Sequence, residues 1–347
     1  AQLQLAILMY RQKEYESAAE AAEKFLEQYP GSELLAHAAY WLGMSQLALG
    51  RWDAAAVTFD DAAKAYPDHA LAAAIHFSAA EAYRQSGDAT TAGVFYERVA
   101  ESWPESRWSD DALQTLTQMS LDANQPTRAV QWAEVFQARY PDSPLALTVK
   151  QMEGRAALKQ GQFDTAIAVF ESLMDEVQAE SDRISAEPNT QAETAEDAQD
   201  AAADSDQAGS PDPANEYYLA LSLLGAQRFD EALEALDRLS TLTEPQELVD
   251  GLQVARASAL IGLKQYAQAV VPLRAYLHSQ PDGADAAKCK AQLAVALAKL
   301  GRWDEAAEAF HQMRADRVDA TLYLPAVEYM AEAAYGAERR ELARELF

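Results

Sequence analysis

The chain has a single cysteine, Cys289, among its 347 residues, so it cannot contain an intrachain disulfide. Cys289 lies between two lysines in a segment with helical spacing. It is either a small packing residue or a thiol whose pKa the lysines lower. We favour packing, because no residue at a spacing suited to thiol chemistry accompanies it.

Long apolar runs and basic residues are also scarce. No run approaches the roughly 20 apolar residues of a membrane span, so direct membrane insertion is not expected. Lys and Arg total 28 against 55 Asp and Glu, a net charge of −27. A nucleic-acid-binding protein needs a basic face, which this composition does not supply. The charge predicts either solubility, including in a salt-rich habitat, or attraction to a basic protein partner, and we favour the former.

The motifs of common catalytic sites are missing. The five histidines include no His-x-x-x-His pair of the kind that binds zinc on a helix. No glycine-rich phosphate loop and no Gly-x-Ser-x-Gly nucleophile turn occurs. The sequence therefore predicts no metal, no cofactor and no catalytic residue, and we expect the chain not to be an enzyme.

What the chain does contain is an alanine that recurs every 37 residues, with one longer interval of 66. Its nine positions are Ala18, Ala55, Ala92, Ala129, Ala166, Ala232, Ala269, Ala306 and Ala343. A fixed period in this range is typical of a repeat protein in which similar units stack, rather than of a single globular core.

Each unit reads as helix, tight turn, helix, because its apolar and small residues have the spacing of a helical face on both sides of a turn residue such as Gly50. A small residue lies twelve positions before each repeating alanine, and an aromatic ring lies three before it in most units. The rings should fill the wedge between helices. Ala89, Pro126 and Arg340 replace the ring, so the third, fourth and ninth units should pack less well there.

This pattern resembles the tetratricopeptide repeat (TPR) family over nearly the whole chain. The resemblance implies an all-α fold, a right-handed α-solenoid of stacked helix pairs, that acts as a non-catalytic protein-interaction scaffold. The family's usual period is 34 residues. Here the extra residues follow the terminal proline, as Pro-x-Ser. Ser32, Ser106 and Ser143 are expected as N-caps, with one added turn at the start of the following helix.

The Pro-x-Ser variant, followed by Tyr-Trp-Leu-Gly at residues 40–43, is similar to TPR domains of bacterial envelope proteins. These include the periplasmic coordinator of the Tol-Pal system and outer-membrane assembly lipoproteins. The resemblance implies a periplasmic or envelope-associated protein that serves envelope assembly or maintenance. A cytoplasmic or extracellular scaffold, or the substrate-recruiting TPR region of a larger enzyme, are the alternatives.

The period divides the chain into three parts. Residues 1–177 are expected to form five units, the first truncated, and residues 214–347 four units, the last truncated. Residues 178–213 between them are rich in Asp, Glu, Ala, Ser and Pro, and we expect a disordered acidic insertion. This linker is either a solvated loop, an acidic arm for a basic partner or for the chain's own groove, or a hinge. Asp212 and Pro213 should cap and begin the next helix.

In TPR arrays the first helix of each unit lines a concave groove, which implies a peptide-binding set in this chain. A protein or peptide ligand is the expected partner, and the sequence assigns no oligomeric state. Some of these side chains could instead pack between first helices. The predicted groove set is His37, Tyr40, Met44, Phe77, Glu81, Arg84, Gln114, Gln118, Gln151, Arg155, Tyr217 and Leu221.

Overall fold

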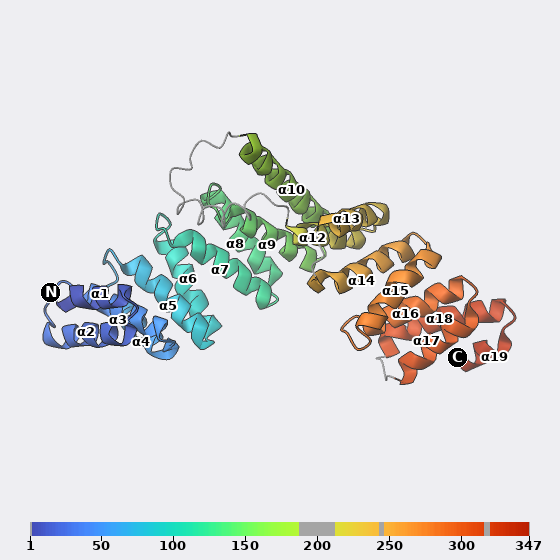
Figure 1. The fold of residues 1–347 in the computed structure, drawn as a ribbon, viewed down its shortest axis with the longest axis horizontal. Helices are drawn as coiled ribbons and strands as arrows, with labels where there is room; N and C mark the ends of the chain where they lie inside the picture. The colour runs from blue at the N-terminus through green and yellow to red at the C-terminus, as the bar shows by residue number, and fades with distance from the viewer. Residues whose placement is uncertain (1, 187–211, 243–245, 316–319, 347) are drawn as a thin grey trace. The chain divides into compact units, whose positions relative to one another are not determined.

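The computed structural model describes residues 2–186, 212–242, 246–315 and 320–346, and these contain α-helices and connecting turns without a β-strand (Figure 1). The helices are α1 (Gln2–Arg11), α2 (Tyr15–Gln28), α3 (Leu35–Ala48), α4 (Trp52–Ala65), α5 (Ala72–Ser86), α6 (Ala89–Ser102), α7 (Ser109–Asp122), α8 (Pro126–Arg139), α9 (Ala146–Lys159), α10 (Phe163–Ala186), α12 (Pro213–Gly225), α13 (Phe229–Leu242), α14 (Gln246–Gly262), α15 (Tyr266–Ser279), α16 (Ala286–Lys299), α17 (Trp303–Ala315), α18 (Ala320–Gly336) and α19 (Arg340–Leu346).

The predicted all-α repeat architecture is confirmed. Across the described residues the helices follow one another as helix–turn–helix pairs, and each repeating alanine is the fourth residue of the second helix of its pair. All nine of these alanines are buried, with at most 2% of their surface exposed. These positions are packed on all sides, so a larger side chain there would push the neighbouring helices apart.

The turn inside each pair has one recurring backbone feature, a left-handed residue five positions before the repeating alanine. Four of these residues are glycines, including Gly50 at φ 71°. The other five are Lys13, Asn124, Gln227, Lys264 and Glu338, with φ between 54° and 63°. Only glycine adopts this conformation at no steric cost, so the turn geometry is imposed by the packing of the two helices rather than by local preference.

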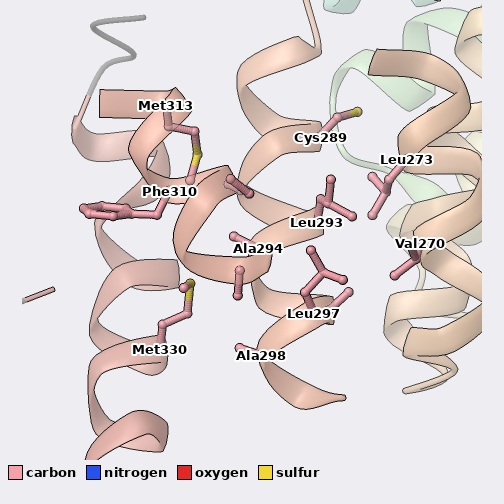
Figure 2. Packing of buried hydrophobic residues seen from close by; sticks show 14 of the residues in the cluster. Val270, Leu273, Cys289, Leu293, Ala294, Leu297, Ala298, Phe310, Met313 and Met330 are labelled. Carbon is pink, nitrogen blue, oxygen red and sulfur yellow. The ribbon is translucent and has the colours of Figure 1, made fainter. Parts of the chain in front are cut away.

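The small residues twelve positions before the alanine are also buried, as the sequence predicts. At Gly43 the reason is direct, because a Cβ added there would lie 2.5 Å from the ring of the fully buried Phe59. Between α15 and α16 the packing continues in the same way, and Figure 2 shows Leu293 and Leu297 facing Leu273 and Val270.

The structure divides into two compact units, residues 1–156 and 157–347. The division falls within α9 and not in the acidic segment predicted as the linker at residues 178–213. Helix α10 runs to Ala186, so residues 178–186, expected to be disordered, are helical. Their alternation of charged residues with Val177 and Ile184 continues the helical pattern that begins at Phe163.

The remainder of the acidic segment, residues 187–211, lies outside the described residues. The predicted helix start after it is confirmed. The Asp212 carboxylate accepts a hydrogen bond from the Ala214 backbone N–H at 2.9 Å, and Pro213 is the first residue of α12. The acidic side chain accepts a hydrogen bond from a backbone N–H that has no partner within the helix. Its negative charge also interacts favourably with the positive end of the helix dipole.

The Pro-x-Ser serines cap a separate turn instead of lengthening the helix. The hydroxyls of Ser32, Ser106 and Ser143 each accept a hydrogen bond from the N–H two residues later, at 3.1 to 3.2 Å. The α-helix itself begins only at the third residue after each serine, so the expected added helical turn is wrong. A single tight turn precedes the helix instead, closed by the serine carbonyl as in Leu35 N–H to Ser32 O.

Candidate protein-binding site

The predicted groove residues lie on the first helices of their pairs, namely α3, α5, α7 and α9 in residues 1–156. Helices α3 and α5 contact each other directly. We refer to the first helices α3, α5, α7 and α9 together as the first-helix layer. Every member of the set on α3, α5 and α7 keeps part of its surface accessible, which a binding residue requires.

Aromatic rings dominate the start of this layer. The ring of Phe77 stacks on Trp108 with centroids 4.9 Å apart, and it meets the buried Tyr96 edge-on at 5.7 Å. The guanidinium of Arg107 lies 4.3 Å from the centroid of Trp108. Tyr40 on α3 meets Trp41 edge-on and lies at a tilted angle to Phe59. Tyr40, Phe77 and Trp108 are half-buried, and the buried rings of Phe59 and Tyr96 pack against Tyr40 and Phe77. The exposed parts of these rings therefore offer rigid apolar surface to a ligand at little entropic cost.

Polar contacts fix the orientation of the α3 side chains. The Ser78 hydroxyl on α5 lies 3.7 Å from the Met44 sulfur. Burial raises the pKa of Tyr40, while the Ser78 hydroxyl and the Arg107 guanidinium act in the opposite direction. The hydroxyl of Tyr40 is therefore neutral at physiological pH and available as a hydrogen-bond donor.

His37 faces a second histidine that the sequence did not single out. Its ring meets that of His69 edge-on, with centroids 5.0 Å apart. Partial burial, and then the neighbouring His69, lower the pKa of His37. The Nδ1 atom of His69 accepts a hydrogen bond from the Leu71 N–H at 3.0 Å, the contact that serine makes in other units. His69 thus has a structural function in the turn before α5.

Glu81 and Arg84 form an ion pair on α5, with 2.7 Å between Arg84 Nη2 and Glu81 Oε2. The hydroxyl of the buried Tyr96 donates a hydrogen bond to the other carboxylate oxygen of Glu81. Burial and this carboxylate together raise the pKa of Tyr96. The pKa of Asp111 is also raised, first by its partial burial and then by Asp110 and Glu81. This part of the layer is therefore acidic, with one compensating arginine.

The amide-rich section follows on α7 and α9. The Gln118 side chain donates a hydrogen bond to the Asp122 carboxylate at 2.6 Å, and Gln114 lies half-buried one turn before it. Gln151 and Arg155 are half-buried on α9. These side chains offer hydrogen-bonding groups where the earlier helices offer rings, so the layer changes from apolar to polar along its length.

Two further members belong to the second unit, on α12. A Cβ added to Gly251 would lie 2.5 Å from the Tyr217 hydroxyl oxygen. The ring of Tyr217 therefore lies against α14. Burial is the main cause of the raised pKa of Tyr217. Leu221 packs against the apolar core of its own unit. For these two residues the alternative of packing between first helices describes the contacts better than an open site.

Sequence reasoning missed Trp108, although a signal for it exists. The 37-residue period places Leu34, Leu71, Trp108 and Leu145 at one position, immediately before the first helix. The residue before a helix often packs back on that helix. A tryptophan at a position that is leucine in the other three units indicates a contact that leucine does not make. Tyr96 was missed because its contact with Glu81 joins two helices and has no local signature.

An open cleft of about 710 Å³ lies at the ends of α5 and α7 and the beginnings of α6 and α8. The side chains around it are both apolar and charged. They include Arg84, Ala89, Val94, Glu97, Gln118, Met119, Asp122 and Arg128. Ala89 stands at the first residue of α6, where most units have a ring. The expectation of poorer packing in the third, fourth and ninth units stays a prediction. We call this opening the Ala89 cleft.

No described part of the chain brings three or more His, Cys, Asp or Glu side chains together in an arrangement that could hold a metal ion. Cys289 is fully buried, and its burial, then the charge of Asp285, raise the pKa of its thiol to about 11. The packing interpretation of Cys289 is therefore confirmed. No described helix combines the length and the apolar character that a bilayer crossing requires.

Comparison with known proteins agrees with this geometry. Residues 1–121 match the model of the YfiO family, described as outer membrane lipoprotein, and residues 288–312 match a tetratricopeptide repeat model. A comparison with the curated proteins gives no match. One similar solved structure is the C-terminal part of a TPR protein from Cytophaga hutchinsonii. It is 11% identical, with a TM-score of 0.55 over 83% of this chain and 98% of that one.

A second similar structure is that of Naa15/Naa10 bound to HypK-THB. It is 15% identical, with a TM-score of 0.50 over 97% of this chain and 46% of that one. At these identities the likeness establishes the fold alone. The chain therefore has a tetratricopeptide repeat fold, and its first third has the sequence character of an envelope lipoprotein family.

Proposed function

We propose that this chain is a non-catalytic scaffold that binds a segment of another protein on the first-helix layer of residues 1–156, in the bacterial envelope. The observation that carries the proposal is the supported aromatic surface of Tyr40, Phe77 and Trp108. Accessible, rigid rings with adjacent polar groups are the residue types that dominate protein-interaction sites.

The envelope context rests on the family match. The aromatic surface and the Glu81–Arg84 pair lie inside residues 1–121, the range that matches the outer membrane lipoprotein family. The ring surface and the lipoprotein-like sequence thus coincide in one part of the chain. This supports an envelope partner over a cytoplasmic one.

The charge of the layer indicates the character of the ligand. Asp111 lies close enough to Glu81 for the Glu81 carboxylate to contribute to its raised pKa, and Arg84 is the cation paired with Glu81. A segment with apolar anchors and a basic residue would place its anchors on the rings and its charge near these carboxylates. Long-range attraction from a chain of net charge −27 would speed its association.

The test is to capture partners from an envelope extract with the wild-type chain and with the Tyr40→Ala/Phe77→Ala double variant, at low and high salt. A partner lost with the double variant at both salt concentrations supports the ring surface as its site. A partner kept by the variant but released by salt would move binding to the acidic surface and contradict the proposal. Val57→Ala, at a largely exposed position on the second helix α4, is the control.

A further inference from the structure

The Ala89 cleft has a structural explanation in the repeat register. In most units the first residue of the second helix is a ring, and in two of them this ring is seen to pack on the end of the next unit's first helix. A Cβ added to Gly225 would lie 2.2 Å from the ring of Phe163. A Cβ added to Gly262 would lie 2.6 Å from the ring of Phe229.

The same two register positions differ in the third and fourth units. Ala89 stands where Phe163 and Phe229 stand, and Asp122 stands where Gly225 and Gly262 stand, seven residues before the repeating alanine. The cleft is lined by both Ala89 and Asp122, so its open volume occurs where a ring is present in other units. Its 710 Å³ falls within the range of small-ligand pockets.

The walls of the cleft suit an aromatic group. Leu116 and Met119 of α7 and Gly93 and Val94 of α6 line it, and Val94 keeps 57% of its surface exposed. A methionine thioether makes favourable contacts with a ring, and a flexible chain adapts to the ring's shape. An inserted ring would cover the exposed valine and leave little apolar surface in contact with water.

The charges of the cleft select the group next to the ring. Arg84 is paired with Glu81, and Arg128 is paired with Glu97. Within the described part of the chain, Asp122 accepts a hydrogen bond from the neutral Gln118 and forms no ion pair. Asp122 is also exposed, so a cation can approach it. The charge that remains available to a ligand is therefore negative.

We propose that the Ala89 cleft binds an aromatic side chain that a partner protein presents next to a lysine or arginine, the ring replacing the one that the third unit lacks. The proposal deepens the scaffold function and rests on it, because the occupant belongs to the bound segment. It names a site at the ends of α5 and α7, beside the aromatic surface of Tyr40 and Phe77 rather than on it.

The probe is tryptamine, which carries an indole ring and an ammonium group and nothing else that could bind. It is titrated into the full chain labelled with ¹³C at the methionine methyl groups, and Met119→Leu identifies the Met119 signal among the seven methionines. We expect the Met119 signal to shift saturably, with a Kd on the order of 1 mM for so small a ligand. Indole-3-propionate, with the opposite charge, should bind more weakly.

Two variants test the two halves of the cleft. Ala89→Tyr restores a ring of the kind found at Tyr15 and Tyr266, and it should abolish the tryptamine shift at Met119. Ala54→Tyr, at an exposed position in the first turn of α4, should leave that shift unchanged. Asp122→Asn, on the surface, should raise the Kd for tryptamine about threefold. The same variant should bind tryptamine no more tightly than indole-3-propionate.

The outcomes separate this inference from the scaffold proposal. The proposed site would be wrong if the Met119 signal does not shift, or if it still shifts saturably in Ala89→Tyr. Either result would stand even if the Tyr40/Phe77 surface binds a partner. Conversely, Tyr40→Ala/Phe77→Ala should bind tryptamine as the wild type does. The peptide Gly-Trp-Lys-Gly should displace tryptamine, and Gly-Ala-Lys-Gly should not.

Discussion

At the residue scale, the structure depends on side chains that are as small as the space allows. Gly43 lies against Phe59, and the recurring alanines lie where two helices touch. Other units have alanine at the position of Gly43, for example Ala80 and Ala220, and there Tyr96 and Leu236 occupy the register position of Phe59. The tolerance of one position therefore varies between units, and each unit's own packing decides it.

Gly43→Ala should destabilise the chain by about 1 kcal/mol. Overpacking costs about 1–3 kcal/mol, and the better helix propensity of alanine offsets up to about 1 kcal/mol of it. Gly93→Ala is the matched control, because nothing lies within 4 Å of its added Cβ, and it should stabilise α6. Urea unfolding of both variants measures the difference, and two changes of the same sign would contradict the packing argument.

His76 should make stability depend on pH. It is buried against Trp103 and Phe95, and burial is the main cause of its lowered pKa. The unfolded chain then binds a proton below pH 6.5 that the folded chain does not bind, so stability falls as pH falls through that range. The slope should approach about 1.4 kcal/mol per pH unit.

His76→Gln removes the titrating group and keeps a polar side chain near the Ala72 carbonyl. The free energy of unfolding of wild type and variant should be measured at pH 7.5 and 5.5. We expect the wild type to lose about 1 kcal/mol more than the variant between these values. Equal losses would mean that His76 does not contribute to the pH dependence.

At the scale of elements, the turn inside each pair needs one left-handed residue. Glycine fills this position in four units, whereas Lys13, Asn124, Gln227, Lys264 and Glu338 fill it in the others. A non-glycine residue in this conformation costs roughly 1 kcal/mol or more. The helices on both sides must supply that energy, since Asn124 alone of the five has a side chain suited to the conformation.

Gln227→Gly should therefore stabilise the α12–α13 pair, and Gly161→Gln should destabilise the α9–α10 pair. The expected changes are about 0.5 to 1 kcal/mol, because relief of the strain is partly offset by the greater freedom of glycine in the unfolded chain. Thermal unfolding of the two variants gives the comparison. A lower midpoint for Gln227→Gly would show that the turn is not strained.

At the scale of the whole molecule, the chain separates into two compact units. From α1 to α8 and from α12 to α17, each helix packs on the next one along the chain. In such an array stability is a sum of local terms, so a change in one unit spreads little beyond the next. A binding surface in the early units can then tolerate strain without loss of structure in the later ones.

Gly43→Ala offers a direct measurement of this locality. In hydrogen exchange followed by mass spectrometry, amides of α3 and α4 should exchange faster in the variant, while those of α16 and α17 should exchange as in the wild type. The physical reason is that no shared core joins these helices. Faster exchange in all helices together would instead show that the chain unfolds as one cooperative unit.

The sequence by itself determined the all-α repeat architecture and the register of the helix pairs. These features follow from the periodic placement of small side chains, above all the alanine at 37-residue intervals. The start of α12 at Asp212 and Pro213 was equally local, because a cap and its helix are adjacent in sequence.

Only the tertiary structure decided which side chains meet across helices. The stacking of Phe77 on Trp108, the bond from Tyr96 to Glu81 and the pairing of His37 with His69 all join separate segments. Periodicity fixes the face on which a residue lies, but the partner it meets depends on how neighbouring helices rotate and approach, and no local pattern records that.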